Sequence, residues 1–292
     1  MTAHETMVLH AFGALVPVDA SLPTSAALPG GAARPGAPTI DAPLELELDP
    51  VSQADRDSFP RPRQVIRRRV GWAIDFGEWE TLPRDVAPPE REAFDPSHRD
   101  ERGVVVDRAA VPMSGVVWDV EGRFLARRFS TQLDRGAVFN LGLFPSPARV
   151  RFGRDGGLVG SLALADGRAL PFAHLIFDVA IVGRGTLMLE AQSDRYGDFA
   201  MPLTGMPELP RGATPLRGRL RVRGRAPPPG FDPERLVDPA ALLSSAVDVA
   251  LLAPATLRNA GGGFDPDLSF QFRAGEIQTV IAGGGPLVAA VV

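Results

Sequence analysis

Residues 193–203, SDRYGDFAMPL, decide the fold more than any other stretch of this chain. Residues 194–197 have the Asp-x-x-Gly spacing of a tight turn, and the residues after them alternate as in a half-buried strand. We therefore expect Phe199, Met201 and Leu203 on one inward face. An earlier stretch, residues 160–171 (GSLALADGRALP), is a second alternating strand that is interrupted by Asp-Gly. Because Asp-Gly supplies the positive φ that a hairpin turn needs, this stretch marks a strand reversal.

Together the two stretches resemble the carboxypeptidase regulatory-like module, a small transthyretin-like β-sandwich. That module has a strand, a DG-x-x-L-P turn and a later (S/T)D-x-x-G-x-F-x-L-P-L strand. The resemblance covers roughly residues 155–225, about a quarter of the chain. It implies a fold but no catalytic chemistry, because in zinc carboxypeptidases the module lies beside the catalytic domain. The HxxE pattern of that catalytic domain occurs here only as HRDE at residues 98–101, outside the region of resemblance, so we do not carry peptidase activity over to this chain.

The resemblance and the alternation predict that residues 155–225 fold as one compact antiparallel sandwich. Side chains that share its inner face should be buried. These are Leu162, Leu164, Leu170, Ile176, Phe199, Met201 and Leu203.

The composition excludes several kinds of chemistry. The chain has 292 residues, is 45% hydrophobic and has a formal net charge of -4, which fits a soluble globular protein and argues against an electrostatic nucleic-acid binder. All 31 basic residues are arginine, so a lysine Schiff base and a P-loop lysine are excluded. Cysteine is absent, which excludes thiol nucleophiles, disulfides and cysteine-bound zinc.

The first residues lack the pattern of a signal peptide or of a membrane span. Residues 1–10 carry no positive side chain, and the apolar run at 8–18 is interrupted by His10, Gly13 and Pro17. We therefore expect a cytoplasmic protein with no membrane span, which is assembled there and could be released as part of a particle.

Changes in composition divide the chain into four regions. Residues 1–60 form an N-terminal arm with a linker at 20–43 that is rich in Ala, Pro and Gly and followed by an alternating strand at 44–48. Residues 61–153 form a β domain, residues 154–226 the regulatory-like β-sandwich, and residues 227–292 a C-terminal extension. The fold class is mainly β, with tandem small antiparallel sandwich units of which the second is transthyretin-like.

The β domain contains short strand-like stretches at 70–76, 103–107, 116–120, 124–129, 137–144 and 148–152. Its Asp-Gly turns and its Arg-alternating stretch at 149–152 parallel those of the next region. Two interpretations remain open: a degenerate tandem repeat of sandwich units, or ordinary hairpins that share Asp-Gly turns.

The C-terminal extension is expected to contain a helix and a hairpin. Asp232-Pro233 and Asp238-Pro239 have the pattern of a cap followed by proline at the first helical position, and residues 240–252 are the best helix candidate. A β-hairpin should follow at 268–272 and 276–281, with a last apolar strand at 287–292. This strand is either covered inside the fold or paired with another subunit.

None of the candidate sites has the spacing that its chemistry needs. Asp75-Phe76-Gly77 spells a kinase magnesium triplet without the lysine that accompanies it, and Glu78 and Glu80 are interpreted as solvated strand residues rather than an acid–base pair. The four histidines lack metal-binding spacing, and the acidic loop at 95–101 lacks the spacing of an EF-hand. Two glycine runs, 261–263 and 283–285, are interpreted as hairpin turns. We therefore predict no catalytic, metal-binding or cofactor-binding residue and no cofactor.

The function expected from these observations is that of a non-enzymatic structural or connector subunit of a multi-protein assembly, such as a phage-tail-like or contractile injection particle. The partners should be other protein subunits, bound through the N-terminal arm and the C-terminal strand, and not nucleic acid. Residues 67–69, three consecutive arginines, would suit an acidic partner face. The alternative is a carbohydrate- or peptide-binding module with Trp72 and Trp79 as the sugar platform. An enzyme with an unfamiliar carboxylate site is the third option.

Overall fold

The structure, a computed structural model, describes residues 13–21, 24–25, 39–49, 64–69, 71–75, 111–133, 138–181, 183, 185–207, 215–237, 245–281 and 285–291. These residues are mainly in β-strands that form several sheets, as the sequence predicts. The helical elements that are fully described are short 3-10 turns: η2 (Pro147–Arg149), η3 (Pro233–Val237) and η4 (Val249–Leu251). No helix in the described part of the chain is long and apolar enough to cross a membrane.

Strands from the first half of the chain form two sheets around one core. The four-stranded sheet has the order β4-β5-β1-β8, and its strands are β1 (Gly13–Asp19), β4 (Gln64–Arg68), β5 (Gly71–Asp75) and β8 (Val138–Leu143). The three-stranded sheet has the order β3-β6-β7, and its strands are β3 (Leu44–Leu48), β6 (Val111–Asp119) and β7 (Arg127–Leu133). The core between them, called the first core, includes Leu15, Trp72, Ile74, Leu141, Met113, Val117, Phe129 and Leu133.

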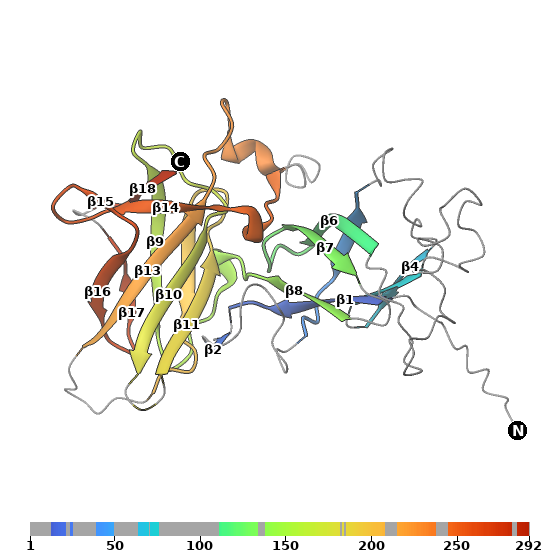
Figure 1. The fold of residues 1–292 in the computed structure, drawn as a ribbon, viewed down its shortest axis with the longest axis horizontal. Coiled ribbons are helices and arrows are strands. Elements are labelled where there is room, and N and C mark those ends of the chain that lie inside the picture. Colours follow the sequence, from blue (N-terminus) through green and yellow to red (C-terminus); the bar gives the residue numbers. More distant parts are fainter. Residues whose placement is uncertain are drawn as a thin grey trace, which may run out of the picture.

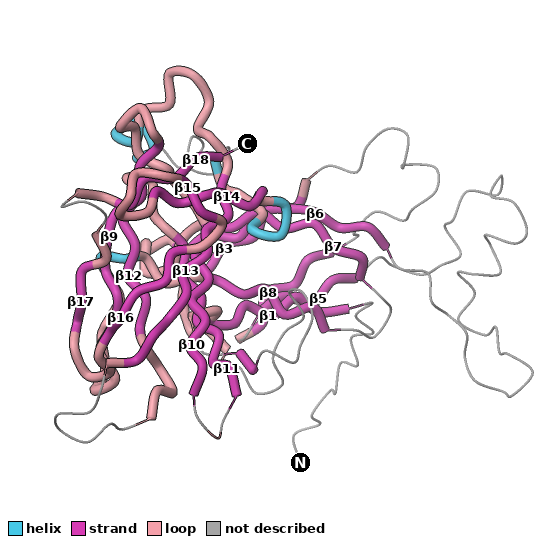
Figure 2. Tube along the Cα trace, turned by 60° about the vertical axis from the view of Figure 1, so that its left-hand side comes forward, coloured by secondary structure: helices cyan, strands magenta, loops and turns pink. Residues whose placement is uncertain are grey.

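The rest of the described chain forms one eleven-stranded sheet with the order β12-β9-β18-β14-β13-β10-β11-β2, to which β15, β16 and β17 add at the sides. Its strands are β2 (Thr24–Ser25), β9 (Gly157–Leu164), β10 (His174–Ile181), β11 (Gly185–Gln192), β12 (Asp198–Pro202), β13 (Leu216–Gly224), β14 (Ala253–Arg258), β15 (Phe264–Asp265), β16 (Leu268–Phe272), β17 (Ile277–Thr279) and β18 (Leu287–Val291). The two groups of strands lie side by side along the long axis of the molecule (Figure 1), and the turned view in Figure 2 shows the same arrangement.

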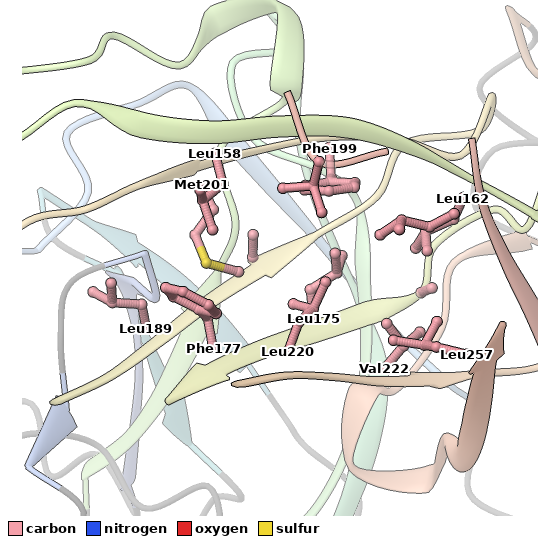
Figure 3. Packing of buried hydrophobic residues seen from close by; sticks show 14 of the residues in the cluster. Leu158, Leu162, Leu175, Phe177, Leu189, Phe199, Met201, Leu220, Val222 and Leu257 are labelled. Atoms are coloured by element: carbon pink, nitrogen blue, oxygen red, sulfur yellow. The ribbon is translucent and has the colours of Figure 1, made fainter. Parts of the chain in front are cut away.

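The eleven-stranded sheet folds back on itself, so that β9 and β12 lie across a core from β10, β11 and β13. Figure 3 shows Leu158 and Met201 facing Phe177 and Leu189 from the opposite side of this core. Burying such large apolar side chains is worth about 1.5–3 kcal/mol each. This second core is therefore the main source of stability for this part of the chain.

Residues 193–203 fold as the sequence predicts. Asp194 begins the turn from β11 to β12, Gly197 has a positive φ of 81°, and the Asp194 N–H donates to the Asp198 carbonyl at 2.8 Å. Phe199, Met201 and Leu203 are buried, with exposed fractions of 2%, 0% and 1%. The Asp-Gly turn at 166–167 also reverses the chain, because Gly167 has a φ of 85° and Ala163 pairs with Ala169.

The predicted register fails on β10. Six of the seven expected side chains are buried, but Ile176 is only half-buried, because Leu175, Phe177 and Val179 are the ones that face the second core. Phe172 adopts a positive φ of 53° just before the strand, and this unusual backbone falls between the predicted turn and β10. A one-residue difference in register exchanges the two faces of a strand.

The C-terminal segment is not an extension but part of the eleven-stranded sheet. The expected hairpin at 268–272 and 276–281 is wrong: β16 pairs with β13, and β17 pairs in parallel with β9. The last strand, β18, lies between β9 and β14, so the expectation of a bare strand available to another subunit is also wrong. In the expected helix at 240–252, residues 245–252 contain a β-bridge and the 3-10 turn η4, and the earlier residues lie outside the described ranges.

The N-terminal arm is also used inside the fold where it is described. β1 pairs with β5 on one side and β8 on the other, and Leu15 is fully buried. Ile40 and Ala42, in the expected linker, pack into the first core. The expected strand at 148–152 is not formed, because Pro147 starts the 3-10 turn η2 there. Another expected strand, at 103–107, lies outside the described residues.

Candidate functional site

Most of the side chains considered as candidate sites lie outside the described residues. These are Phe76, Gly77, Glu78, Trp79, Glu80, His4, His10, His98 and the loop at 95–101. Of the glycine runs, 261–263 forms the turn between β14 and β15, where the Asn259 N–H donates to the Gly263 carbonyl at 2.8 Å. No group of three or more His, Cys, Asp or Glu side chains that could hold a metal ion occurs in the described part of the chain.

The residues expected to serve as binding platforms are partly used in packing. Trp72 is 5% exposed in the first core, so it cannot present a sugar platform. The Arg67 guanidinium stacks on the Trp72 ring at 4.5 Å and donates to the Ala42 carbonyl at 3.0 Å. Arg68 and Arg69 are exposed, so two of the three consecutive arginines remain open to a partner.

Buried polar side chains join the two groups of strands at a place that we call the junction. His174 at the start of β10 is 7% exposed; its ring lies 5.4 Å from the Phe144 ring, and its Nε2 lies 3.2 Å from Glu190 Oε2. Arg127 at the start of β7 lies near Glu190; its Nε atom is buried, and its guanidinium donates to the Gly142 carbonyl. Burial lowers the pKa of the Arg127 guanidinium, while the carboxylates of Asp248 and Glu190 favour its charged form.

Asp248 holds the segment around η4 against β7. One carboxylate oxygen accepts the Ser130 N–H at 3.1 Å, and the other accepts the Ala250 N–H at 3.0 Å as the cap of η4. The backbone of this segment adds a second contact, since the Arg128 N–H donates to the Val247 carbonyl at 3.2 Å. Phe144, Val249 and Leu252 form a small apolar cluster beside these bonds. The junction is thus both apolar and hydrogen-bonded.

A pocket of about 660 Å³ lies between the two groups of strands, near the junction. The end of β1, the turn from β6 to β7, the chain from β8 to β9 and the end of β12 surround it. Its lining residues are Asp19, Ser21, Arg123, Phe124, Pro145, Ala148, Arg149, Val150, Arg151, Pro202 and Thr204. The volume lies within the range of small-ligand sites.

The arginines of this pocket are held in different ways. Arg123 Nε lies 3.3 Å from Asp119 Oδ2 and 3.1 Å from Glu121 Oε2, and the fully buried Asp119 side chain also accepts the backbone N–H groups of the turn. Arg149 and Arg151 are exposed, and no carboxylate among the described residues pairs with them. The Asp19 carboxylate accepts two hydrogen bonds from Ser21: its Oδ1 accepts the Ser21 N–H at 2.9 Å and the Ser21 hydroxyl at 2.6 Å.

This arrangement suits binding of an anionic group rather than its chemical conversion. Free guanidinium groups form bidentate hydrogen bonds with carboxylates, and the ring of Phe124 and the nearby prolines offer apolar surface. The sequence contains one signal for this pocket, the alternating arginines at 149 and 151, but this alternation predicts a strand and not a pocket. The pocket itself forms only when distant segments meet.

Comparison of the chain with family models, curated proteins and solved structures found no significant match.

Proposed function

We propose that this chain is a non-enzymatic structural or connector subunit of a multi-protein assembly. The observation that supports this best is the junction, where Asp248, Arg127 and Phe144 join two apolar cores through buried contacts. A connector must keep its two ends in a fixed relation, and buried hydrogen bonds and apolar contacts provide this better than a flexible linker would. A particle of the phage-tail-like or contractile-injection type is the assembly that the resemblance suggests.

The finer description of the fold belongs to the same proposal. We propose tandem sandwich units, with residues 154–226 as the transthyretin-like one. The chain reversals at Asp166-Gly167 and at residues 194–197 and the antiparallel pairing of β9 with β12 support this assignment. In the described structure this unit is completed by β14 to β18, whose side chains Leu257, Phe272 and Leu287 enter the second core.

The proposed attachment of the N-terminal arm is now limited to residues 1–12, because β1 is an inner strand of its sheet. Deleting residues 1–43 would remove β1 and the buried side chains of Ile40 and Ala42, so that deletion would damage the first core. A deletion of residues 1–12 keeps all of these and is the sharper test.

The experiment compares the tagged full-length chain with the chain that lacks residues 1–12, both expressed in the source cell. We expect the full-length chain to sediment in a large particle, and the shortened chain to be folded but to sediment as a monomer. Folding of the shortened chain is checked by circular dichroism. A full-length chain that sediments entirely as a monomer would contradict the subunit proposal.

The pocket supports a second candidate function, a peptide- or carbohydrate-binding module. Its exposed arginines, Arg149 and Arg151, favour a carboxylate-bearing ligand, such as a peptide with an acidic side chain or a uronate sugar. The test is binding to arrays of acidic peptides and glycans by the wild type and by the double variant Arg149→Gln/Arg151→Gln. Arg235→Gln is the control, because the Arg235 side chain is 85% exposed and does not line the pocket. Binding that is lost equally in the control would argue against a pocket ligand.

A further inference from the structure

The outer face of β13 carries a row of arginines. Along this strand Leu220 and Val222 face the second core, while Arg217, Arg219 and Arg221 are exposed and Arg223 is half-exposed. Alternate side chains on a strand lie about 6.6–6.8 Å apart, so the four guanidinium groups begin along a line of about 20 Å. We call these four residues the arginine row. Figure 1 shows β13 between β10 and β16, so the row lies in the middle of the sheet face and not at its edge.

The neighbouring strands neutralise only part of this charge. On β10, Asp178 lies opposite Arg219 and binds Arg221 at 2.7 Å and Arg219 at 3.9 Å. On the other side, Asp267 lies 3.8 Å from Arg219. The β16 residues opposite Arg217 and Arg219 are uncharged Gln271 and Ser269. Of the described carboxylates, none pairs with Arg217 or Arg223.

A row of like charges in a chain of net charge -4 repels itself and is costly unless an opposite charge lies against it. Arg217, at the end of the row away from the junction, is exposed, whereas Arg223 donates to the Ala250 carbonyl at 3.5 Å beside the junction. The Arg217 end of the row is therefore accessible to a partner, whereas the Arg223 end is held at the junction. Such a row is typical of a surface that pairs with a complementary partner.

We infer that the arginine row binds an acidic, extended segment of a partner protein, with carboxylates at alternate positions. An extended segment repeats its alternate side chains at the same 6.6–6.8 Å, so each carboxylate can meet one guanidinium in bidentate geometry. A helix would present same-face residues at i, i+4, i+7 and i+11, which span about 16.5 Å rather than 20 Å. Asp178 and Asp267 interrupt the positive charge of the row, so it offers no continuous track of cations for the phosphate backbone of a nucleic acid.

This inference rests on the proposed function in one respect only, namely that the acidic segment belongs to a partner in the assembly. The binding test itself needs only the purified full-length chain. The probe is a fluorescent peptide that alternates Glu and Ser over seven residues, and it is compared with a block peptide of the same composition and with a single-stranded oligonucleotide of similar length. Binding is measured by fluorescence anisotropy at low and at high salt.

The test variant is Arg217→Gln/Arg219→Gln, and the matched control is Arg168→Gln/Arg235→Gln. Both remove two positive charges from exposed side chains, which are 56% exposed at Arg219, 54% at Arg168 and 85% at Arg235. We expect the alternating peptide to bind the wild type and the control equally, and the test variant to bind it about tenfold more weakly. High salt should weaken binding to the wild type.

Three results would overturn the inference: equal affinity of test variant and wild type, equal affinity for alternating and block peptides, or tighter binding of the oligonucleotide. Failure of the proposed function would look different. In that case the chain would sediment as a monomer in cells while the purified protein still bound the alternating peptide through its arginine row.

Discussion

Asp194 organises the turn that leads into β12. Its Oδ1 accepts the N–H groups of Tyr196 at 2.8 Å and Asp198 at 3.1 Å, while the adjacent Ser193 hydroxyl accepts the Ala173 N–H at 2.8 Å and donates to the Leu170 carbonyl. Burial is the largest influence on Asp194 and raises the pKa of its carboxyl group, and the two N–H donors oppose that shift. The side chain thus supplies an acceptor that the turn needs and a charge that its burial disfavours.

Replacing Asp194 separates these two roles. Asp194→Asn keeps the oxygen that accepts both N–H groups and removes the charge, so we expect it to be at least as stable as the wild type at pH 7. Asp194→Ala removes the acceptor and should lower the free energy of unfolding by about 1–3 kcal/mol. Urea unfolding of the three proteins gives both values. An Asn variant as unstable as the Ala variant would show that the charge holds the turn.

The pH dependence of Asp194 has a definite sign. Because its folded-state pKa is raised, the folded protein binds the proton more tightly than the unfolded chain does, and stability falls as the pH rises from the ordinary Asp value of about 3.9 through the raised value. The wild type should therefore approach the stability of Asp194→Asn as the pH falls towards 4. A gap between the two that widens on acidification would contradict the raised pKa.

Gly197 and Gly167 both have a positive φ, of 81° and 85°, but their surroundings differ. A Cβ at Gly197 would collide with the Leu162 carbonyl oxygen, whereas nothing lies within 4 Å of a Cβ at Gly167. Both Gly→Ala variants bear the backbone strain of about 1–2 kcal/mol, and only Gly197→Ala adds the collision. We expect a clearly lower melting temperature for Gly197→Ala than for Gly167→Ala. An equal drop in melting temperature in both variants would mean that the turn at Gly197 shifts to make room for the Cβ atom.

The last strand, β18, completes the eleven-stranded sheet. It pairs in parallel with β9 through Leu287–Ala289 and antiparallel with β14 through Ala289–Val291, and Leu287 and Ala289 are buried in the second core. Without β18, the backbone groups of two strands would lose their partners and the core would open on that side. An apolar strand at the end of a chain is here a structural element of the core.

Removing residues 287–292 should therefore abolish cooperative unfolding of the second core. We expect the truncated chain to lose the sharp thermal transition in circular dichroism and to bind a hydrophobic dye. Val288→Ser is the milder comparison, since Val288 is half-buried and its strand pairing is kept. A truncated chain that melts as the wild type does would show that β18 is dispensable.

The whole molecule depends on the junction between its two cores. Asp248 accepts the Ser130 N–H of β7 and favours the charged form of Arg127, whereas Asp49 forms a partly exposed pair with Arg128 at 2.7 Å. The three tryptophans are Trp72, Trp79 and Trp118, all in the region before residue 153. Tryptophan fluorescence therefore reports on the first group of strands, and circular dichroism reports on both.

Asp248→Asn should uncouple the two cores. It removes a charged acceptor from the Ser130 and Ala250 N–H groups, at a cost of about 1–3 kcal/mol, while the control Asp49→Asn breaks the partly exposed pair with Arg128, which is worth about 0–1 kcal/mol. In the wild type and the control we expect fluorescence and circular dichroism to follow one urea transition. In Asp248→Asn the two signals should separate. Coincident transitions in all three proteins would contradict coupling through the junction.

Local patterns predicted the turns and many strands of this protein correctly. Asp-x-x-Gly at 194–197, Asp-Gly at 166–167 and the Leu-Glu alternation of β3 depend on backbone preferences that act over a few residues. The strand at 148–152 was predicted wrongly because alternating arginines outweighed Pro147 and its 3-10 turn. The pocket arginines Arg149 and Arg151 were visible in the sequence, but their shared site was not.

The sequence by itself determined the β class, the turns and the apolar faces of most strands, because each of these depends on neighbours along the chain. Only the tertiary structure decided that β18 lies between β9 and β14 and that β1 is an inner strand. It also decided that β16 pairs with β13 and β17 with β9, instead of with each other. Strand pairing uses backbone groups that all residues share, so the partner is set by which apolar faces can be buried together. The junction and the pocket also depend on this strand pairing, because their residues come from segments that meet only when both cores are packed.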